Sequence, residues 1–373
     1  MKQPVISDVL ALTMVISVSL WHSMATAADN TPGKVGLGQP FWKSGTMTNE
    51  PVLFVQEHGR PSATGKLLFT PRANLRITQP DKVTAYVAGK DYLWKPGSQV
   101  IELTTNSHIP FKTAAEMLPS PGSSNTIGGV LWSEGHYFHD LQVQVSYTHD
   151  GKFALPDSPP PPPLTRSLEK LRSRQTFKIV ALGDSITEGY NASGFEKTKG
   201  PPYQPSYPQL VADTLQERFG SPVSLLNLGK AGTRANWGLG MVSKVAEARP
   251  DLIILAFGMN HSEPAPAFES AMRQLRDAVQ AATPQADIVL VACMTANPRV
   301  HPTERYGGYR DALRNLELPN VALADVTTPW MELLKQKPFS DLSGNNVNHP
   351  NDFGHRLYAQ VICELLPSGN SSR

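Results

Sequence analysis

Hydrophobic positions in the second half of the chain form short apolar runs separated by stretches with helical spacing. The runs lie at 177–182, 223–228, 252–257, 288–293 and 321–324. Between them, segments such as 207–219 and 268–282 repeat their apolar residues at the period of an α-helix. Apolar strands that alternate with helices predict a parallel sheet covered on both faces. Because there are five such strands, we expect a flavodoxin-like doubly wound α/β domain over residues 176–368.

The first half of the chain has another pattern, in which short alternating segments are bounded by Gly, Pro, Asn and Asp. Clean alternation of apolar and polar residues occurs at 83–87, 100–103 and 141–147. No helix-period run of comparable length accompanies them. We therefore predict a smaller all-β domain over residues 30–155, of the sandwich or jelly-roll type.

Five consecutive prolines at 159–163 separate the two halves. Such a run fits neither a helix interior nor a sheet and favours stiff polyproline II structure. We predict a linker over residues 156–175, in which the basic segment 164–174 forms a short helix or a solvated face.

The N-terminus has the pattern of a secretory signal. Lys2 precedes an apolar run at 9–20, and small residues follow at Ala25 and Ala27. We predict that residues 1–27 are cleaved and that the protein is secreted or periplasmic. A membrane anchor is the alternative, but this run is shorter than the roughly 20 residues that span a bilayer.

Net charge bears on the possible partners of the protein, and cysteine content bears on disulfides. The formal net charge is +2 and no long basic run occurs, so a nucleic-acid partner is not expected. The two cysteines, Cys293 and Cys363, are too few for a disulfide framework. Two free thiols and a single bridge are both compatible with the sequence.

The second half of the chain contains four polar motifs. Three of them follow predicted strands, and the fourth lies near the C-terminus. Ligands of open α/β sheets bind beyond the carboxyl ends of the strands, so such motifs are expected to share one site. In chain order they read GDSITEG at 183–189, NLGKAGT at 227–233, GMNH at 258–261 and NVNHPND at 346–352. Together they resemble the four blocks of the SGNH, or GDSL-type, hydrolase family, over residues 177–366.

The resemblance implies a role for one residue in each block. Ser185 would be the nucleophile and His349 its base, because a serine hydroxyl needs an adjacent base to attack an ester. Gly232, Asn260 and the backbone N–H of Ser185 would donate hydrogen bonds to the oxyanion. No cofactor or metal ion is implied. The structural alternatives are a helix-cap serine, a turn glycine and a loop asparagine.

The sequence departs from the family at one position. The family places an aspartate three residues before its histidine, and here that residue is Asn346. Three outcomes are open: Asn346 or a main-chain carbonyl orients His349 in a Ser-His dyad, Asp341 or Asp352 supplies the charge, or the enzyme is slow. We favour the dyad, with Asn346 as the possible orienter.

Three further residues near these motifs have a functional and a structural interpretation. His261 could line the site or serve only in its loop, and Arg234 could reach the site or remain a surface arginine. His355 lies six residues after His349 on a predicted helix, so it should face elsewhere and is not expected to bind a metal.

An exported chain with a β-sandwich before an SGNH-like domain resembles two-domain carbohydrate O-acetylesterases. The resemblance implies a secreted serine esterase whose substrate is an acetylated polysaccharide or oligosaccharide. The tyrosines and prolines of the connection 190–206, with Trp237, could wall a sugar cleft, although packing is the alternative. A sugar O-acetyltransferase, a lipase or lysophospholipase, and a polysaccharide-binding protein with a relict site are the competing interpretations.

Overall fold

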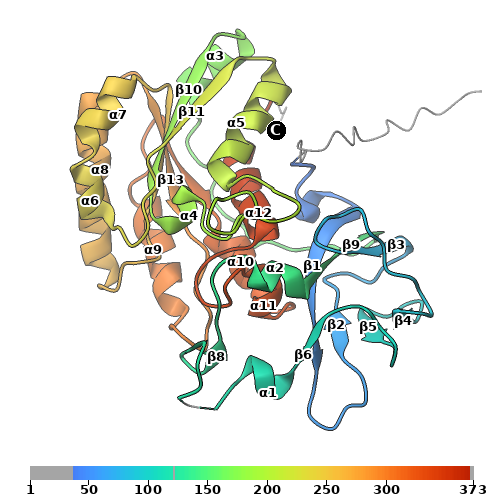
Figure 1. Ribbon diagram of the computed structural model, residues 1–373. Helices are drawn as coiled ribbons and strands as arrows, with labels where there is room; N and C mark the ends of the chain where they lie inside the picture. The colour runs from blue at the N-terminus through green and yellow to red at the C-terminus, as the bar shows by residue number, and fades with distance from the viewer. Residues whose placement is uncertain (1–36, 121, 370–373) are drawn as a thin grey trace, which may run out of the picture. The chain divides into compact units, whose positions relative to one another are not determined.

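The computed structural model describes residues 37–120 and 122–369 (Figure 1). These residues cluster as one compact unit, which contains both sheets described below. The predicted signal at 1–27 lies outside the described residues. Within the ranges that the structure describes, no helix combines the length and apolar character needed to cross a membrane.

The second half of the chain forms a five-stranded parallel sheet. Its strands are β10 (Phe177–Gly183), β11 (Val223–Asn227), β12 (Leu252–Ala256), β13 (Asp287–Ala292) and β14 (Val321–Asp325). They lie in the order β11-β10-β12-β13-β14, and every neighbouring pair is parallel. This is the flavodoxin-like order, with the reversal between β11 and β12 on either side of β10. The predicted parallel sheet is confirmed.

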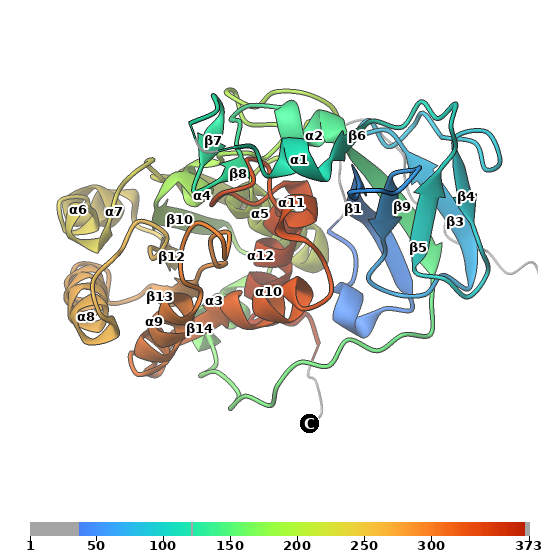
Figure 2. The same ribbon diagram turned by 90° about the horizontal axis from the view of Figure 1, so that it is seen from below.

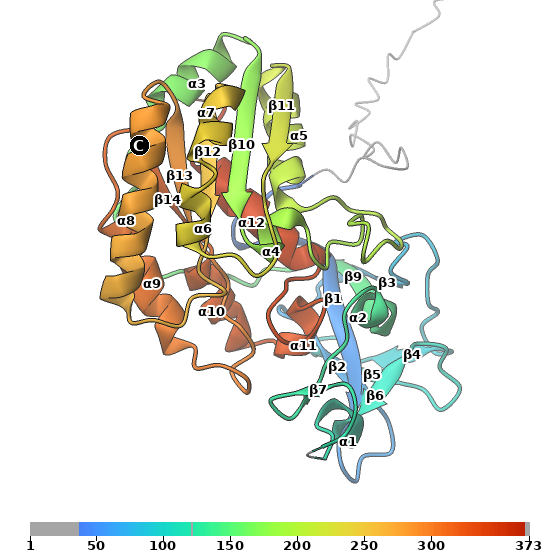
Figure 3. The ribbon, with the colours of Figure 1, turned by 60° about the vertical axis from the view of Figure 1, so that its left-hand side comes forward.

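Helices cover both faces of this sheet (Figure 3). Alternate side chains of β10 separate the two cores: Ile179 packs with α5 and α12, and Val180 packs with α8 and α9. The helices are α3 (Thr165–Arg172), α4 (Ser185–Glu188), α5 (Tyr207–Phe219), α6 (Ala235–Leu239), α7 (Val242–Ala248), α8 (Ala265–Ala282), α9 (Glu304–Arg314), α10 (Thr327–Leu334), α11 (Phe339–Leu342) and α12 (Asp352–Glu364).

The first half forms a mostly antiparallel sheet of seven strands. They are β1 (Thr46–Gln56), β2 (Thr64–Lys66), β3 (Ala73–Thr78), β4 (Tyr92–Trp94), β5 (Val100–Leu103), β6 (Phe111–Thr113) and β9 (Gln142–Thr148). The order is β3-β9-β1-β2-β5-β4, and β6 joins β1 in parallel. A mainly antiparallel sheet is thus present where an all-β domain was predicted, whereas the sandwich or jelly-roll form stays a prediction.

The predicted strand at 83–87 is wrong. Only a single bridge forms there, between Thr78 and Ala85. The carboxylate of Asp81 accepts hydrogen bonds from the backbone N–H groups of Val83 and Thr84, which fixes a local turn in place of a strand. Val83 and Val87 are left 75% and 55% exposed, so these two alternating apolar side chains do not join the core.

Shorter elements fill the connections of the first half. They are η1 (Phe41–Lys43), α1 (Ala114–Met117), α2 (Tyr137–Leu141) and the hairpin of β7 (Thr126–Ile127) and β8 (Val130–Leu131). Residues 149–164, which include the five prolines, form no helix or strand. The predicted domain boundaries stay a prediction, since both halves belong to one compact unit.

A buried ionic cluster joins the N-terminal sheet to the second half. Figure 2 shows the two elements that it links, β1 and α11, side by side. The Lys337 ammonium lies 2.7 Å from a carboxylate oxygen of Glu50 on β1 and 2.7 Å from one of Asp341 on α11. Burial alone would lower the pKa of Lys337, but these two carboxylates raise it overall. Asp341 also accepts the backbone N–H of Leu53 at 2.9 Å. The cluster fixes β1 against the segment that leads into the candidate site.

Candidate active site

Ser185 lies at the carboxyl end of β10, as the first residue of α4. Asp184 is the N-cap of this short helix and accepts the backbone N–H of Ile186 at 3.0 Å. A side chain at Gly183 would collide with Thr187 and with the carbonyl of Ala256 on β12, so only glycine allows so tight a strand-to-helix turn. The turn holds Ser185, which is 4% exposed, at the edge of the sheet where ligands of this fold bind.

His349 reaches Ser185 from the loop between α11 and α12. Its Nε2 lies 3.0 Å from Ser185 Oγ, within the reach expected of a base and its nucleophile. The loop is held by the side-chain oxygen of Asn345, which accepts the backbone N–H groups of Val347, Asn348 and His349. The structure therefore brings together the predicted nucleophile and base from positions 164 residues apart.

The predicted oxyanion donors lie on two loops that are bonded to the nucleophile turn. The backbone N–H of Lys230 donates to Gly183 O at 3.0 Å, and that of Ala231 donates to a Glu188 carboxylate oxygen at 2.6 Å. Gly232 follows in the left-handed region with φ of 75°, a conformation that favours glycine. This loop thus places the backbone of Gly232 beside the turn that carries Ser185.

Asn260 extends the same arrangement from the loop after β12. One amide hydrogen of its Nδ2 is donated to Thr233 O at 3.1 Å. That bond fixes the amide next to Gly232 and leaves its second hydrogen for another acceptor. The Ser185 N–H, the Gly232 N–H and the Asn260 amide are the donor types needed around a tetrahedral oxyanion.

The structure does not place Asn346 against His349, which corrects the expected orienter. The Asn346 side-chain amide donates to Leu131 O at 2.9 Å, and the main-chain carbonyl of Asn346 accepts from Asn297 Nδ2 at 2.8 Å. Its backbone has φ of 62°, so its side chain leaves the loop in a direction different from that of an extended residue. Asn191 takes the position instead, with its Oδ1 2.9 Å from His349 Nδ1.

Neither alternative carboxylate supports His349. Asp341 is bonded to Lys337 and to Leu53 N. Asp352 accepts the backbone N–H and the hydroxyl of Ser193, at 2.8 and 2.7 Å. Both carboxylates therefore bind other segments of the fold. The carboxylate near the His349 ring is that of Glu134, whose Oε1 lies 3.5 Å from His349 Nδ1.

His261 and Arg234 occupy the loops behind the oxyanion donors. The His261 ring is 2% exposed, accepts the Ala235 N–H at Nε2 and is bonded to the Glu263 carboxylate at Nδ1. These contacts give His261 the structural role in its loop. Arg234 is an exposed residue directly before α6.

His355 is fully buried on α12 beneath the loop that follows α4. Its Nε2 bonds to Tyr190 O at 3.1 Å, and its Nδ1 accepts the Tyr207 N–H at 3.3 Å. Within the described ranges no three His, Cys, Asp or Glu side chains are grouped so that they could hold a metal ion. Cys293 and Cys363 are both buried free thiols.

One aromatic side chain of the connection after α4 lies beside the base of the candidate pair. The Tyr190 ring is 5.2 Å from the His349 ring, centroid to centroid. Tyr203, further along the connection, is 60% exposed. Trp237 instead packs against the helix-covered core of the sheet, which fits its packing interpretation.

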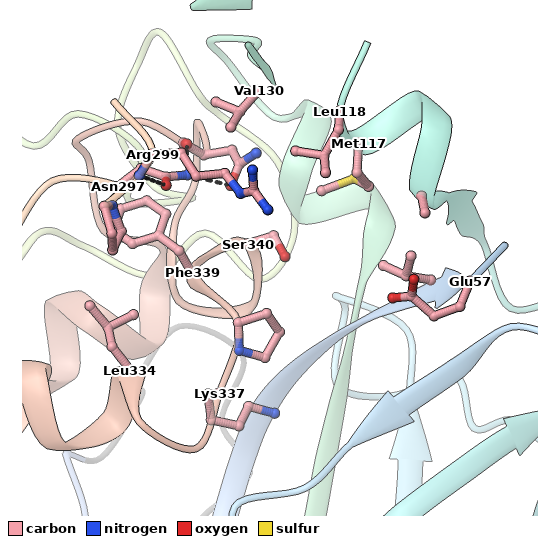
Figure 4. Close-up of a pocket in the computed structure, with 15 residues that line it drawn as sticks. Glu57, Met117, Leu118, Val130, Asn297, Arg299, Leu334, Lys337, Phe339 and Ser340 are labelled. Atoms are coloured by element: carbon pink, nitrogen blue, oxygen red, sulfur yellow. Dashed lines mark hydrogen bonds between the residues drawn. The ribbon is translucent and has the colours of Figure 1, made fainter. Parts of the chain in front are cut away.

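A cleft of about 470 Å³ lies between the N-terminal sheet and the loops after β13 and α10 (Figure 4). Its lining includes Val55, Met117 and Val130 from the first half of the chain and Asn297 and Arg299 from the second. Asn346 contributes to its wall, whereas Ser185 and His349 do not line it. The cleft therefore borders the segment that carries His349 without containing the reactive pair.

Sequence reasoning did not find Asn191, Asn345 or Glu134. Asn191 stands only six residues after Ser185, so its place beside the first motif was a usable signal. Asn345 directly precedes the last motif. Glu134 lies in a connection of the first half and has no motif around it, so only the tertiary structure brings it to His349.

The sheet order, and a serine and histidine bonded at its ligand-binding edge, are typical of a serine hydrolase domain. Residues 181–357 match the GDSL-like lipase/acylhydrolase family, so the chain contains a GDSL-like lipase/acylhydrolase domain, a domain of carboxylic ester hydrolases. The resemblance inferred from the four motifs is confirmed. No curated protein sequence matches the chain.

Three solved structures illustrate the similarity. A two-domain esterase (CEX) active on acetylated mannans has 20% identity and a TM-score of 0.44, over 56% of this chain and 55% of that chain. LAE5, an α/β hydrolase from the metagenome of Lake Arreo in Spain, has 21% identity and a TM-score of 0.42, over 52% of this chain and 97% of that chain. Axe2, an acetylxylan esterase from Geobacillus stearothermophilus, has 18% identity and a TM-score of 0.41, over 52% of this chain and 97% of that chain. The chain thus matches about half the length of the two-domain esterase.

Proposed function

We propose that this protein is a secreted or periplasmic esterase that removes acetyl groups from an acetylated polysaccharide or oligosaccharide. The observation that carries the proposal is the 3.0 Å contact between His349 Nε2 and Ser185 Oγ, in a domain of carboxylic ester hydrolases. Export is inferred from the signal pattern at residues 1–27.

The reaction follows from the positions of these groups. His349 Nε2 takes the proton of Ser185 Oγ as the oxygen attacks the ester carbonyl, and the oxyanion accepts hydrogen bonds from the Ser185 N–H, the Gly232 N–H and the Asn260 amide. The imidazolium then gives its proton to the departing sugar hydroxyl, which leaves Ser185 acetylated. Water, deprotonated by the same nitrogen, releases acetate and restores Ser185.

Burial supports a small acyl group. Ser185 is 4% and His349 6% exposed, which leaves little open surface beside the nucleophile for a long acyl chain. The carbohydrate part of the proposal is supported by Tyr190 beside His349, because flat aromatic rings suit the apolar faces of sugars.

Release of acetate from acetylated xylan and acetylated mannan tests the proposal, with a series of nitrophenyl esters of increasing chain length beside them. We expect release that is lost in Ser185→Ala and highest activity on the acetyl ester. Activity that rises with chain length would favour a lipase. Acetyl transfer to an added glycan in place of free acetate would favour a transferase, and glycan binding without any turnover would favour a relict site.

A further inference from the structure

We infer that Asn191 and Glu134 divide between them the work of a single triad aspartate: Asn191 orients the His349 ring and Glu134 supplies the negative charge. The inference rests on the proposed esterase function. Neither residue belongs to the four motifs, and Glu134 comes from the connection between β8 and α2 in the first half of the chain.

The hydrogen bonds of Asn191 decide which end of its amide faces the histidine. Its Nδ2 donates to Gly135 O at 3.2 Å and to Gly344 O at 3.0 Å, so both amide hydrogens are used. The Oδ1 atom therefore points at His349 Nδ1, and only a protonated Nδ1 can bond to it. A side chain at Gly344 would collide with Asn191, which keeps the two segments in close contact.

Asn345 cannot compete for this bond. Its Nδ2 also lies 3.0 Å from His349 Nδ1, but it donates to Glu134 Oε1 at 2.9 Å and to Asn348 Oδ1 at 3.0 Å. With both of its hydrogens used, it has none to offer to the ring. Nδ1 thus carries the proton, and the lone pair of Nε2 faces the Ser185 hydroxyl, as a general base requires.

Glu134 lies where a positive charge on the ring would be stabilised. Its Oε1 is 3.5 Å from His349 Nδ1 and is held by Asn345, while the next residue, Gly135, accepts from Asn191. Burial opposes ionisation of Glu134, but its interactions with His349 and with Asn345 lower its pKa overall. The carboxylate is therefore charged at neutral pH.

Other charged or titratable groups face the same histidine. Buried Asp184 lies near the ring from the nucleophile turn, and burial raises the pKa of that carboxyl to about 6. His355 faces the ring from α12, and Tyr190 covers it from the connection after α4. Among these groups, Glu134 is the carboxylate placed at the Nδ1 edge of the ring.

The separate roles of Asn191 and Glu134 follow from where the protons of His349 lie during the reaction. When His349 Nε2 accepts the proton of Ser185 Oγ, the Nδ1 proton stays bonded to Asn191 Oδ1, and the ring gains one positive charge. Asn191 is neutral and offsets only part of that charge, whereas Glu134 offsets it electrostatically without becoming protonated. Glu134 and Asn191 are thus positioning residues that act through His349.

The test compares kcat and the pH dependence of kcat/KM for wild type, Glu134→Gln and Glu247→Gln, with a soluble acetyl ester as substrate. Glu247 is an exposed glutamate on α7 and serves as the matched control. We expect Glu134→Gln to lower kcat about 10- to 100-fold, less than the roughly 10⁴-fold loss at a buried triad aspartate, because the Glu134 side chain is 39% exposed. Glu247→Gln should match wild type.

The pH profile separates a charge effect from a structural one. A carboxylate beside the ring favours its protonated form, so removing it should move the acidic limb of kcat/KM to lower pH. Glu134→Asp keeps the charge, and we expect it to hold the limb near that of wild type. It also provides the comparison should Glu134→Gln fold poorly.

Two results would overturn the inference: equal kcat and pH profiles for Glu134→Gln and wild type, or a limb displaced equally by Glu134→Asp and Glu134→Gln. Failure of the proposed function looks different, since it would show as full activity in Ser185→Ala or as no ester turnover by wild type.

Discussion

Asn191 Oδ1 lies 2.9 Å from His349 Nδ1, although 158 residues separate the two positions in the chain. The contact takes over the place that the family gives to an aspartate three residues before its histidine. An asparagine thus orients the ring, while the residue at the usual position, Asn346, holds two loops together.

Replacement of Asn191 by alanine is expected to lower kcat by about 10²- to 10³-fold, because His349 loses the acceptor that fixes its tautomer. KM should change little, since Asn191 contacts the histidine and not the proposed substrate. Steady-state kinetics on an acetyl ester measure both values. A change in KM with an unchanged kcat would contradict the assigned role.

Replacement of Asn346 by glycine should leave kcat within about fivefold of wild type, because its side chain makes no contact with the ring. Glycine is the suitable substitution, since Asn346 has φ of 62° and alanine would be strained there. If Asn346→Gly proves as inactive as His349→Ala, the orienter is Asn346 after all.

Asn260→Ala should lower kcat by about 10²- to 10³-fold with little effect on KM, the usual result of losing one oxyanion donor. The control is Asn236→Ala, which changes an exposed asparagine on α6. A loss in Asn260→Ala that appears as a lower melting temperature with normal kcat would identify a purely structural asparagine.

The stability of the protein should fall as the pH is lowered from about 6.5 to about 4, and His355 should be one cause. Burial lowers the pKa of His355 to about 4, so the folded ring stays neutral while the unfolded chain takes up a proton below its ordinary value of 6.5. The linked loss is about 3 kcal/mol for the whole interval.

Urea unfolding of wild type and His355→Gln at pH 7 and pH 4.5 measures this contribution. The variant should be less stable at pH 7, yet lose less stability on acidification. The buried His139 also has a lowered pKa, so some acid dependence should remain. Identical losses in the two proteins would exclude His355 as a source.

Lys337→Met is expected to destabilise the fold by about 3 to 5 kcal/mol, because Glu50 and Asp341 would remain buried without a counter-charge. Lys335→Met is the matched control. That lysine is 66% exposed and pairs with Glu332 at the surface, so its replacement should cost about 0.5 kcal/mol or less. Equal urea midpoints for the two variants would contradict the proposed importance of the buried cluster.

The second half of the fold was predictable because its strands are buried on both faces and their sequences are continuously apolar. Strand β10 and helix α5 have nearly the predicted bounds, and α5 ends at Gly220 in the left-handed conformation. The first half was harder. Its strands are short, and at 83–87 the side chain of Asp81 turned an alternating segment into a turn.

The site was predictable where local sequence carries the chemistry. Ser185 and His349 lie in motifs, and the structure brings them within hydrogen-bonding distance. The surroundings of Nδ1 were not predictable, because they depend on the path of the backbone at Asn346 and on a connection in the first half of the chain. Glu134 lies 215 residues before His349, and nothing in the sequence alone links the two.

The central claim, that Ser185 becomes acylated with His349 as its base, is tested most directly by the mass of the protein during turnover. Wild type, Ser185→Ala and His349→Ala are mixed with an activated acetyl ester, quenched in acid and measured intact and after digestion. We predict the added mass of one acetyl group on Ser185 in wild type, and none at position 185 in either variant. Steady turnover by wild type with the acetyl group on another residue, or undiminished turnover by Ser185→Ala, would contradict the account.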